Sequence, residues 1–328
     1  MIRVGLLGAG HLGKIHLKLL KQIPDFQIAG FYDPDPKVSK TVAEQFEVKA
    51  FDSLESLIEQ VDALDIVTPT LSHFDCAIKA LEQGKHIFIE KPLTNTIEEA
   101  EALVKFGEEN PEIVIQVGHV ERFNPAFLSV VDLNINPMFI EGHRLAIYNP
   151  RGTDVSVVLD LMIHDLDVIH SLVKSPVKSI QASGVAVISD SPDIANARIQ
   201  FENGCVANLT ASRISMKNLR RLRIFQKSTY LAVDFLKKES EVFSLTDHKV
   251  AQPTPGMMQF EFDTGKEKKY LKFEKPGVPE VNSIKMELEE FAASIACQAP
   301  VRVSVKDGYA ALKTAHEILN MIENSAKE

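Results

Sequence analysis

The chain has 328 residues, a length that favours two domains, although one large α/β barrel is also within range. Hydrophobic residues make up 45% and charged residues 25%, which is the balance of a globular protein with a sizeable core and excludes a disordered or fibrous chain. The 36 basic and 45 acidic side chains give a formal net charge of -9, and such a field repels nucleic-acid phosphates and anionic membranes. We therefore expect neither a nucleic-acid nor a membrane partner.

Cysteine and histidine usage points away from disulfide and metal chemistry. Cys76, Cys205 and Cys297 are widely separated, so we expect no disulfide framework and no zinc knuckle. The ten histidines show no metal-ligand spacing, and we expect no metal. The apolar start, residues 2–10, has no cleavage site of small residues, and no window has the roughly 18 apolar residues of a membrane span. A cytoplasmic protein is the expectation.

From residue 1 to about 120, short apolar runs alternate with segments of helical periodicity. The runs that we interpret as strands are Ile2–Leu7, Phe26–Tyr32, Val48–Phe51, Leu64–Thr68, His86–Ile89 and Ile113–Val117. Two predicted helices begin with capping boxes, one of Asp52 with Glu55 and one of Thr96 with Glu99. Repeated βα units of this kind predict an α/β fold with a doubly wound parallel sheet.

Beyond residue 120 the pattern changes to a second, largely antiparallel sheet. One helical stretch near Val157–Val173 precedes the alternating runs Ser179–Ile188, Ala195–Phe201, Cys205–Ser212 and Leu222–Phe225. Residues 202–204, Glu-Asn-Gly, predict a hairpin turn, and the Pro- and Gly-rich stretch 248–281 predicts irregular chain with one or two short strands. The chain ends in two predicted helices, 286–295 and 308–322.

The turn after the first strand matches the GxGxxG pattern of dinucleotide-binding proteins, as Gly8-Ala9-Gly10-His11-Leu12-Gly13. Gly8 allows the tight turn, Gly10 lets the backbone approach a pyrophosphate, and Gly13 permits close helix packing. Asp33 ends the second strand 20 residues after Gly13, where a carboxylate accepts hydrogen bonds from the adenosine ribose. Because a carboxylate repels a 2′-phosphate, we predict NAD rather than NADP. The strand before the motif, the helix after it and Asp33 together disfavour the alternative of an ordinary glycine-rich turn.

Two further groups are candidates for chemistry. Lys91, within Glu90-Lys91-Pro92, follows the fifth predicted strand, where open α/β sheets bind their ligands. Asp160 and His164 are four residues apart on one face of a predicted helix, and an imidazole oriented by a carboxylate suits removal of a hydroxyl proton. From the residues alone, Lys91 is equally well interpreted as a solvated strand end. For the Asp-His pair, a solvated helix face is slightly the better interpretation.

Together these motifs resemble the family of glucose-fructose oxidoreductase, inositol 2-dehydrogenase and the rhizopine-catabolism oxidoreductases. The matching segments span nearly the whole chain: Gly8–Gly13, Thr68-Pro69-Thr70 with His73, Glu90-Lys91-Pro92, Asp160–Asp165 and the ending from Phe291 to Gly308. The resemblance implies a Rossmann NAD-binding domain over 1–120 and an α/β domain over 121–328 with an open sheet that binds substrate and forms homodimers or homotetramers. It also implies that Lys91, Asp160 and His164 are catalytic. We place Thr68, Thr70, His73, Glu90 and Lys91 at the cofactor with the glycine-rich turn.

A narrower resemblance concerns residues 118–125, Gly-His-Val-Glu-Arg-Phe-Asn-Pro, and the Asp160–Asp165 motif. Both are similar to the branch of the family that oxidises nucleotide sugars such as UDP-N-acetylglucosamine at C3. His119, Arg122 and Asn124, on the chain that leaves the first domain, would reach the substrate or the nicotinamide side of the cofactor. A basic cluster, Arg213, Lys217, Arg220, Arg221 and Arg223, supports this branch, since arginine binds diphosphates well. We take Arg213 as its substrate-binding member, although the cluster is equally consistent with a solvated strand face.

The resulting hypothesis is hydride transfer between a secondary alcohol of a sugar or nucleotide sugar and C4 of NAD. His164 takes the hydroxyl proton, Asp160 orients its ring, and Lys91 polarises the developing alkoxide, while the choice of formal base between His164 and Lys91 stays open. The alternatives are a polyol substrate such as an inositol, a cofactor that stays bound and shuttles hydride, and a non-catalytic NAD sensor. A sensor would need none of these three residues.

Overall fold

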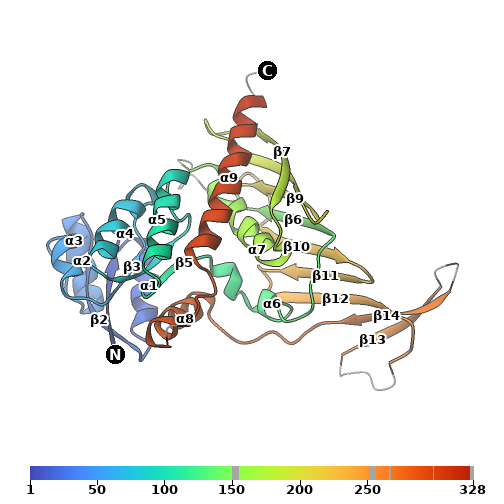
Figure 1. Ribbon diagram of the computed structural model, residues 1–328, viewed down its shortest axis with the longest axis horizontal. Coiled ribbons are helices and arrows are strands. Elements are labelled where there is room, and N and C mark those ends of the chain that lie inside the picture. The colour runs from blue at the N-terminus through green and yellow to red at the C-terminus, as the bar shows by residue number, and fades with distance from the viewer. Residues whose placement is uncertain (150–154, 251–255, 264, 266, 298, 326–328) are drawn as a thin grey trace. The chain divides into compact units, whose positions relative to one another are not determined.

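The computed structural model describes residues 1–149, 155–250, 256–263, 265, 267–297 and 299–325 (Figure 1). The chain divides into two compact units, which are described separately. Unit 1 comprises Met1–Phe123 and Val281–Lys313, and unit 2 comprises Asn124–Glu280 and Thr314–Glu328. Residues 281–313 thus pack with unit 1. The boundary that we predicted from the sequence, at residue 120, had placed them in the second domain. Among the described residues, no helix has both the length and the apolar character needed to cross a membrane.

Unit 1 contains a parallel sheet in the order β2-β1-β3-β4-β5. Its strands are β1 (Ile2–Leu7), β2 (Phe26–Tyr32), β3 (Ala63–Ile66), β4 (His86–Glu90) and β5 (Ile115–Gly118). The strand order changes direction between β1 and β3, and open α/β sheets bind ligands at the carboxyl ends of strands beside such a switch point. The doubly wound parallel sheet predicted from the sequence is confirmed.

The strand predicted over Val48–Phe51 was wrong. This segment makes a single isolated bridge, between Ala50 and Phe31, with Phe31 N donating to Lys49 O and Phe51 N donating to Phe31 O. The pairing stops there because Ser53, two residues after Phe51, is already the N-cap of the next helix.

The helices of unit 1 flank this sheet (Figure 1). They are α1 (His11–Leu20), α2 (Pro36–Phe46), α3 (Leu54–Ile58), α4 (His73–Glu82), α5 (Ile97–Glu109) and α8 (Ser283–Cys297), with short 3₁₀ turns η1 (Thr70–Ser72) and η2 (Val120–Phe123). The capping box of Thr96 with Glu99 is confirmed at α5. The box predicted for Asp52 with Glu55 was wrong, because the Ser53 hydroxyl caps α3 instead and pairs with Ser56.

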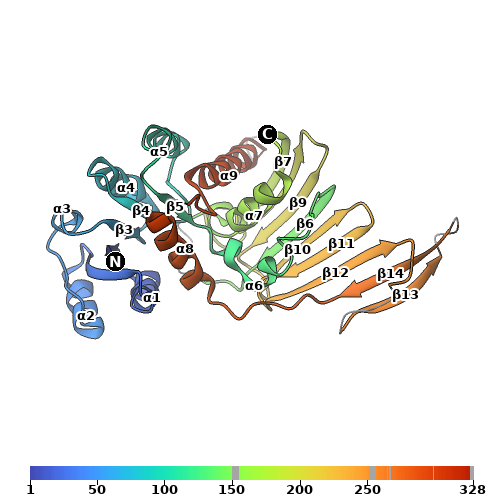
Figure 2. The same cartoon turned by 60° about the horizontal axis from the view of Figure 1, so that its bottom comes forward.

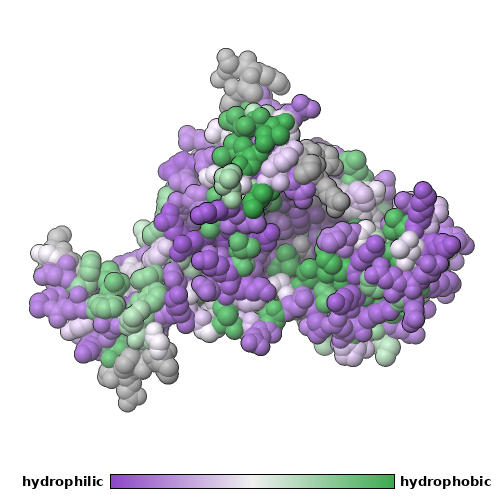
Figure 3. Space-filling view, turned by 180° about the vertical axis from the view of Figure 1, so that it is seen from behind, coloured by the Kyte–Doolittle hydropathy of each residue, from purple (hydrophilic) through white to green (hydrophobic). Residues whose placement is uncertain are grey.

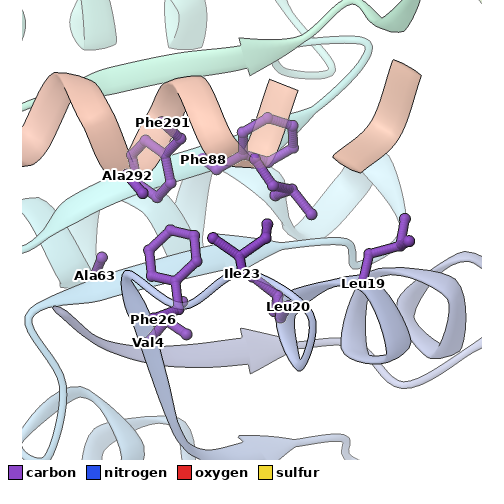
Figure 4. Close-up of a cluster of buried hydrophobic side chains, with 10 residues drawn as sticks. Val4, Leu19, Leu20, Ile23, Phe26, Ala63, Phe88, Phe291 and Ala292 are labelled. Atoms are coloured by element: carbon purple, nitrogen blue, oxygen red, sulfur yellow. The ribbon is translucent and has the colours of Figure 1, made fainter. Parts of the chain in front are cut away.

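Helix α8 supplies part of the core of unit 1. Figure 4 shows Phe291 and Ala292 of α8 against Phe88 of β4 and residues of α1, and the rings of Phe88 and Phe291 lie 6.0 Å apart. Phe26 also contacts Phe291, with ring centroids 6.2 Å apart. This C-terminal helix is therefore a structural element of the unit that carries the glycine-rich turn.

Unit 2 is built on a mixed sheet in the order β13-β14-β12-β11-β10-β6-β9-β8-β7. Its strands are β6 (Phe139–Leu145), β7 (Val177–Val185), β8 (Ile194–Phe201), β9 (Val206–Ser212), β10 (Leu219–Gln226), β11 (Thr229–Asp234), β12 (Glu239–Thr246), β13 (Met258–Asp263) and β14 (Lys268–Glu274). Only β6 and β9 pair in parallel among the described strands of this sheet, which confirms the largely antiparallel prediction. Helix α7 (Ile163–Val173) lies on one face of the sheet (Figure 2), and α6 (Pro125–Leu128) precedes β6.

The edge strand β13 exposes a row of apolar side chains. Met258, Phe260 and Phe262 are 47%, 55% and 45% exposed, and their alternation places them on one face of the strand. In Figure 3 apolar atoms gather on the β13–β14 hairpin, at the left of the view. The last helix, α9 (Val305–Ser325), contains the boundary between the two units.

Candidate active site

A cavity of about 610 Å³ opens in unit 1 at the carboxyl ends of β1, β3 and β4. It is lined by nine of the residues predicted to bind the cofactor: Gly8, Gly10, His11, Leu12, Gly13, Asp33, Thr68, Glu90 and Lys91. Thr70 and His73 are not part of this lining. The cavity at the switch point of the sheet is thus lined by the glycine-rich turn, by Asp33 and by the Glu90-Lys91 pair.

The glycines of the turn have different steric surroundings. Gly8 has φ +86°, and a Cβ there would lie 2.7 Å from the Val67 carbonyl oxygen. A Cβ on Gly13 would lie 2.0 Å from the Gly8 carbonyl oxygen, whereas a Cβ on Gly10 would meet no atom within 4 Å. Gly10 is the N-cap of α1, which has no side-chain cap, so the first amides of this helix are available to an anion. The cavity therefore fits a pyrophosphate at the start of α1.

Asp33 joins two loops as well as lining the cavity. Its Oδ2 accepts a hydrogen bond of 2.8 Å from the Ala9 amide, and its Oδ1 accepts one of 2.9 Å from the Asp35 amide. The sequence did not indicate the bond to Ala9. Each carboxylate oxygen has a second lone pair, so acceptors remain for ribose hydroxyls. The carboxylate thus links the glycine-rich turn to the position predicted for the ribose.

His73 and Glu90 hold the loops that follow β3 and β4. The buried His73 ring has Nδ1 at 2.9 Å from the Pro92 oxygen and Nε2 at 2.9 Å from the Thr68 oxygen, and burial lowers its pKa. Glu90 ends β4, and its Oε2 accepts a hydrogen bond of 3.1 Å from the Lys91 amide. The bond between Lys91 and Pro92 is cis. Lys91 is half-buried at the cavity wall, while His73 supports the wall from behind.

Asp160 and His164 lie in unit 2 on a helix that starts with a π-helical turn, Val158–Met162, and continues as α7. Both side chains are half-buried, and π turns occur frequently at functional sites. The neighbouring Asp165 is buried and accepts a hydrogen bond of 2.7 Å from Arg144 Nη2 and one of 3.1 Å from its Nε. This ion pair anchors the helix at the residue next to His164.

The four predicted substrate residues are largely buried. His119 and Arg122 belong to unit 1, and Arg122 Nη2 lies 3.3 Å from Asp307 Oδ1. Asn124, in unit 2, caps α6 by accepting from the Ala126 amide and donates to the Phe235 oxygen. Arg213 donates to the Val155 oxygen and is only 6% exposed. Their contact with a substrate stays a prediction.

Two other arginines of the predicted basic cluster form ion pairs on the sheet of unit 2. Arg221 Nη2 lies 3.5 Å from Glu241, and Arg223 pairs with Glu141. The positive charge that suggested a diphosphate site is thus partly neutralised by neighbouring strands.

The residues missed by sequence reasoning lie behind the cavity of unit 1. They are His16 of α1, Asp65 of β3 and Glu287 of α8, all fully buried. The signal for Asp65 was an acidic residue inside an otherwise apolar strand, because a buried carboxyl needs a partner. Nothing local linked it to the other two residues, which come from distant parts of the sequence.

The fold and the cavity together define a dinucleotide-binding oxidoreductase. Residues 2–119 match the model of the "Oxidoreductase family, NAD-binding Rossmann fold", and residues 141–228 match the "GFO/IDH/MocA C-terminal domain". The chain belongs to this GFO/IDH/MocA oxidoreductase family and uses NAD, as the sequence predicted.

Similar proteins of the family include two curated dehydrogenases. The chain is 34% identical over 323 residues to the UDP-N-acetylglucosamine 3-dehydrogenase of Acidithiobacillus ferrooxidans, which covers 98% of this chain and 97% of the relative. It is 32% identical over 235 residues to the scyllo-inositol 2-dehydrogenase (NAD(+)) of Bacillus subtilis, covering 65% of this chain and 68% of the relative.

Solved structures agree with these similarities. The structure of the Acidithiobacillus ferrooxidans UDP-N-acetylglucosamine 3-dehydrogenase superposes with a TM-score of 0.87 at 33% identity over 98% of both chains. A putative myo-inositol dehydrogenase from Sinorhizobium meliloti gives a TM-score of 0.78 at 22% identity over 99% of this chain and 98% of that one, a similarity of fold alone.

Proposed function

We propose that this enzyme oxidises a secondary hydroxyl of a nucleotide sugar, with the C3 hydroxyl of UDP-N-acetylglucosamine as the first candidate. The observation that carries the proposal is the extent of similarity to the Acidithiobacillus ferrooxidans dehydrogenase, 34% identity over 98% of this chain. The inositol dehydrogenase of Bacillus subtilis matches at 32% identity over only 65%. A polyol substrate is therefore the second candidate.

In the proposed reaction, Lys91, Asp160 and His164 handle charge and protons. Bound NAD supplies the hydride acceptor. His164 takes the hydroxyl proton as the carbonyl double bond forms, Asp160 orients the imidazole, and the Lys91 ammonium stabilises the developing negative charge on oxygen. The roles of His164 and Lys91 can also be exchanged: Lys91 then starts as the neutral amine and accepts the hydroxyl proton, while a protonated His164 stabilises the charge on oxygen. A non-catalytic NAD sensor is disfavoured, since it would need none of these groups.

Absorbance at 340 nm tests the substrate. Purified enzyme is mixed with NAD and, in parallel, with UDP-N-acetylglucosamine, myo-inositol or glucose. Reduction of NAD with the nucleotide sugar alone is expected. Turnover of inositol alone would replace the first candidate by the second. A spectrum of the purified protein at 340 nm, taken before substrate is added, reveals whether NADH is retained between cycles.

Asp33→Asn is expected to raise the Kd for NAD by about tenfold, because an amide offers the ribose hydroxyls one neutral acceptor in place of a carboxylate. Titration of NADH fluorescence and competition with NAD measure the effect. Asp35→Asn is the matched control: Asp35 caps α2 through Lys37 and Val38 and is not part of the cavity lining. An unchanged Kd in Asp33→Asn would remove Asp33 from the ribose site.

The location, the assembly and the roles of the two domains predicted from the sequence are also proposals. We propose a cytoplasmic homodimer or homotetramer, with residues 1–120 as the NAD-binding domain and 121–328 as the substrate-binding and oligomerisation domain. The apolar row on β13 supports assembly, because an exposed edge strand pairs readily with another chain.

A further inference from the structure

A buried group of ionisable side chains lies behind the cavity of unit 1. His16 of α1 has Nδ1 at 2.9 Å from Asp65 Oδ2 of β3 and Nε2 at 3.3 Å from Glu90 Oε1 of β4. Glu287 of α8 completes the group. His16, Asp65 and Glu287 are fully buried, and Glu90 is 9% exposed where it reaches the cavity. We call these four residues the buried acid cluster.

The contacts of His16 bear on how many protons it shares with Asp65 and Glu90. Both ring nitrogens face carboxyl oxygens, and a neutral imidazole has only one N–H to donate. The Nδ1 contact is a hydrogen bond, whereas Nε2 lies within ion-pair distance of Glu90 without hydrogen-bond geometry. A bare Nε2 lone pair facing a carboxylate oxygen would be repelled by it, so favourable contacts on both sides of the ring need two protons shared by Asp65, His16 and Glu90. Whether the second proton is on the ring or on a carboxyl, the three groups together carry one negative charge.

Burial raises the pKa of Asp65, so the ring and this carboxyl compete for the proton between them. The second carboxyl, Glu90 on the other side of the ring, favours the form with a charged ring. Burial lowers the pKa of His16, but the Coulombic attraction and hydrogen bonds of Asp65 and Glu90 outweigh it and leave that pKa well above its usual value. Burial, together with the charges of Glu90 and Asp65, raises the pKa of Glu287 well above its usual value. The Glu287 carboxyl oxygens have no hydrogen-bond partner among the described residues, which also fits a neutral acid. Strand β5 brings no charged side chain to the cluster: its polar residue there is Gln116, whose Nε2 donates to the Glu287 backbone oxygen.

Glu90 connects this cluster to the cavity. Its Oε1 faces His16, while its Oε2 accepts from the Lys91 amide, so one carboxylate joins the imidazole to the residue that carries the candidate catalytic ammonium. The described members of the cluster do not form a metal site. A group that fixes the position of the Glu90 carboxyl therefore acts on the cavity through its own charge and through the placement of Glu90.

We propose that His16, held by Asp65, is a positioning residue of the dehydrogenase: its charged ring keeps Glu90 as a fixed carboxylate beside Lys91. The inference rests on the proposed function only for its kinetic consequence. Asp33 places the adenosine ribose at one end of the cavity, so Glu90 and Lys91 lie toward the nicotinamide end. A negative charge there stabilises the Lys91 ammonium and favours the cationic oxidised ring over the neutral reduced ring.

Nuclear magnetic resonance of protein with ¹⁵N-labelled histidine tests the charge without any turnover. The expected result is a His16 ring protonated on both nitrogens at pH 7 and still so at pH 8. Its signals are assigned by contacts to the Phe88 ring, whose centroid lies 5.9 Å from that of His16, and by their loss in His16→Gln. A singly protonated His16 ring at pH 7 would overturn the proposal, and this measurement needs only the wild-type chain.

The functional consequence is tested with Asp65→Asn, which removes one anionic partner of His16. We expect the preference for NAD over NADH, measured as the ratio of their Kd values, to fall by about tenfold. With an active substrate, kcat should fall by a similar factor at unchanged sugar KM, and a new ionisation should appear in the profile of kcat between pH 6 and 8.

His86→Gln is the matched control for this variant, since His86 is a half-buried histidine of the same unit whose Nδ1 accepts from the Val114 amide. It should leave the ratio of Kd values unchanged. An Asp65→Asn protein with a wild-type ratio and pH profile would reduce the cluster to a structural role. If no sugar is turned over, the proposed function fails, but this inference is still tested. The NMR measurement of His16 protonation and the ratio of the Kd values for NAD and NADH need no substrate.

Discussion

Lys91→Met is expected to lower kcat by about 10³-fold while the Kd for NAD changes by less than about threefold. Methionine keeps the apolar stem of the side chain but removes the ammonium that stabilises the oxygen charge. The Glu90 contact to residue 91 is made by the backbone amide, so the loop should keep its position. Initial rates at 340 nm and NADH fluorescence titrations separate the loss of chemistry from any loss of cofactor.

The control is Lys18→Met, the same substitution at an exposed position of α1 outside the cavity lining. It should retain wild-type kcat. His164→Ala should lose a factor similar to that of Lys91→Met, and the double variant should lose little more, because groups that act as one unit are strongly non-additive. More than a tenth of the wild-type kcat in Lys91→Met would exclude the ammonium from the chemical step and leave His164 as the base.

The parts of the fold that were predictable are those governed by local pattern. Strands β1 and β2 have the predicted bounds, because continuous apolar runs between clear turn signals define a buried parallel strand. The placement of α8 in unit 1 was not predictable, since it depends on contacts of Phe291 with Phe26 and Phe88, some 200 residues or more away in the sequence. Strands β6 and β12 were missed because charged residues interrupt their alternation, and β11 was missed because its apolar residues are consecutive rather than alternating.

The residues of the site likewise fall into those that could be predicted from the sequence and those that could not. A motif of consecutive residues, such as the glycine-rich turn or Glu90-Lys91-Pro92, could be located from the sequence because the spacing itself encodes the geometry. The cluster of His16, Asp65 and Glu287 could not, because three separate elements bring it together. Asn124 shows the opposite case, since a residue assigned to the substrate by resemblance also has a capping role within its own unit.

Gly13→Ala and Gly10→Ala are expected to separate folding from cofactor binding at the glycine-rich turn. A Cβ on Gly13 would lie 2.0 Å from the Gly8 carbonyl oxygen, and backbone cannot move aside as a flexible side chain can. We expect Gly13→Ala to lower the free energy of unfolding by about 3 kcal/mol and to weaken NAD binding with it.

Gly10→Ala should behave differently, because its φ of -66° suits alanine and a Cβ there meets no protein atom within 4 Å. Its free energy of unfolding should change by less than about 1 kcal/mol, the scale of an altered N-cap, while the Kd for NAD rises by about 10²-fold. Urea denaturation followed by circular dichroism and NADH titration measure the two quantities. Wild-type affinity in Gly10→Ala would mean that the pyrophosphate does not cross the start of α1, because the added methyl group has only the cofactor to meet.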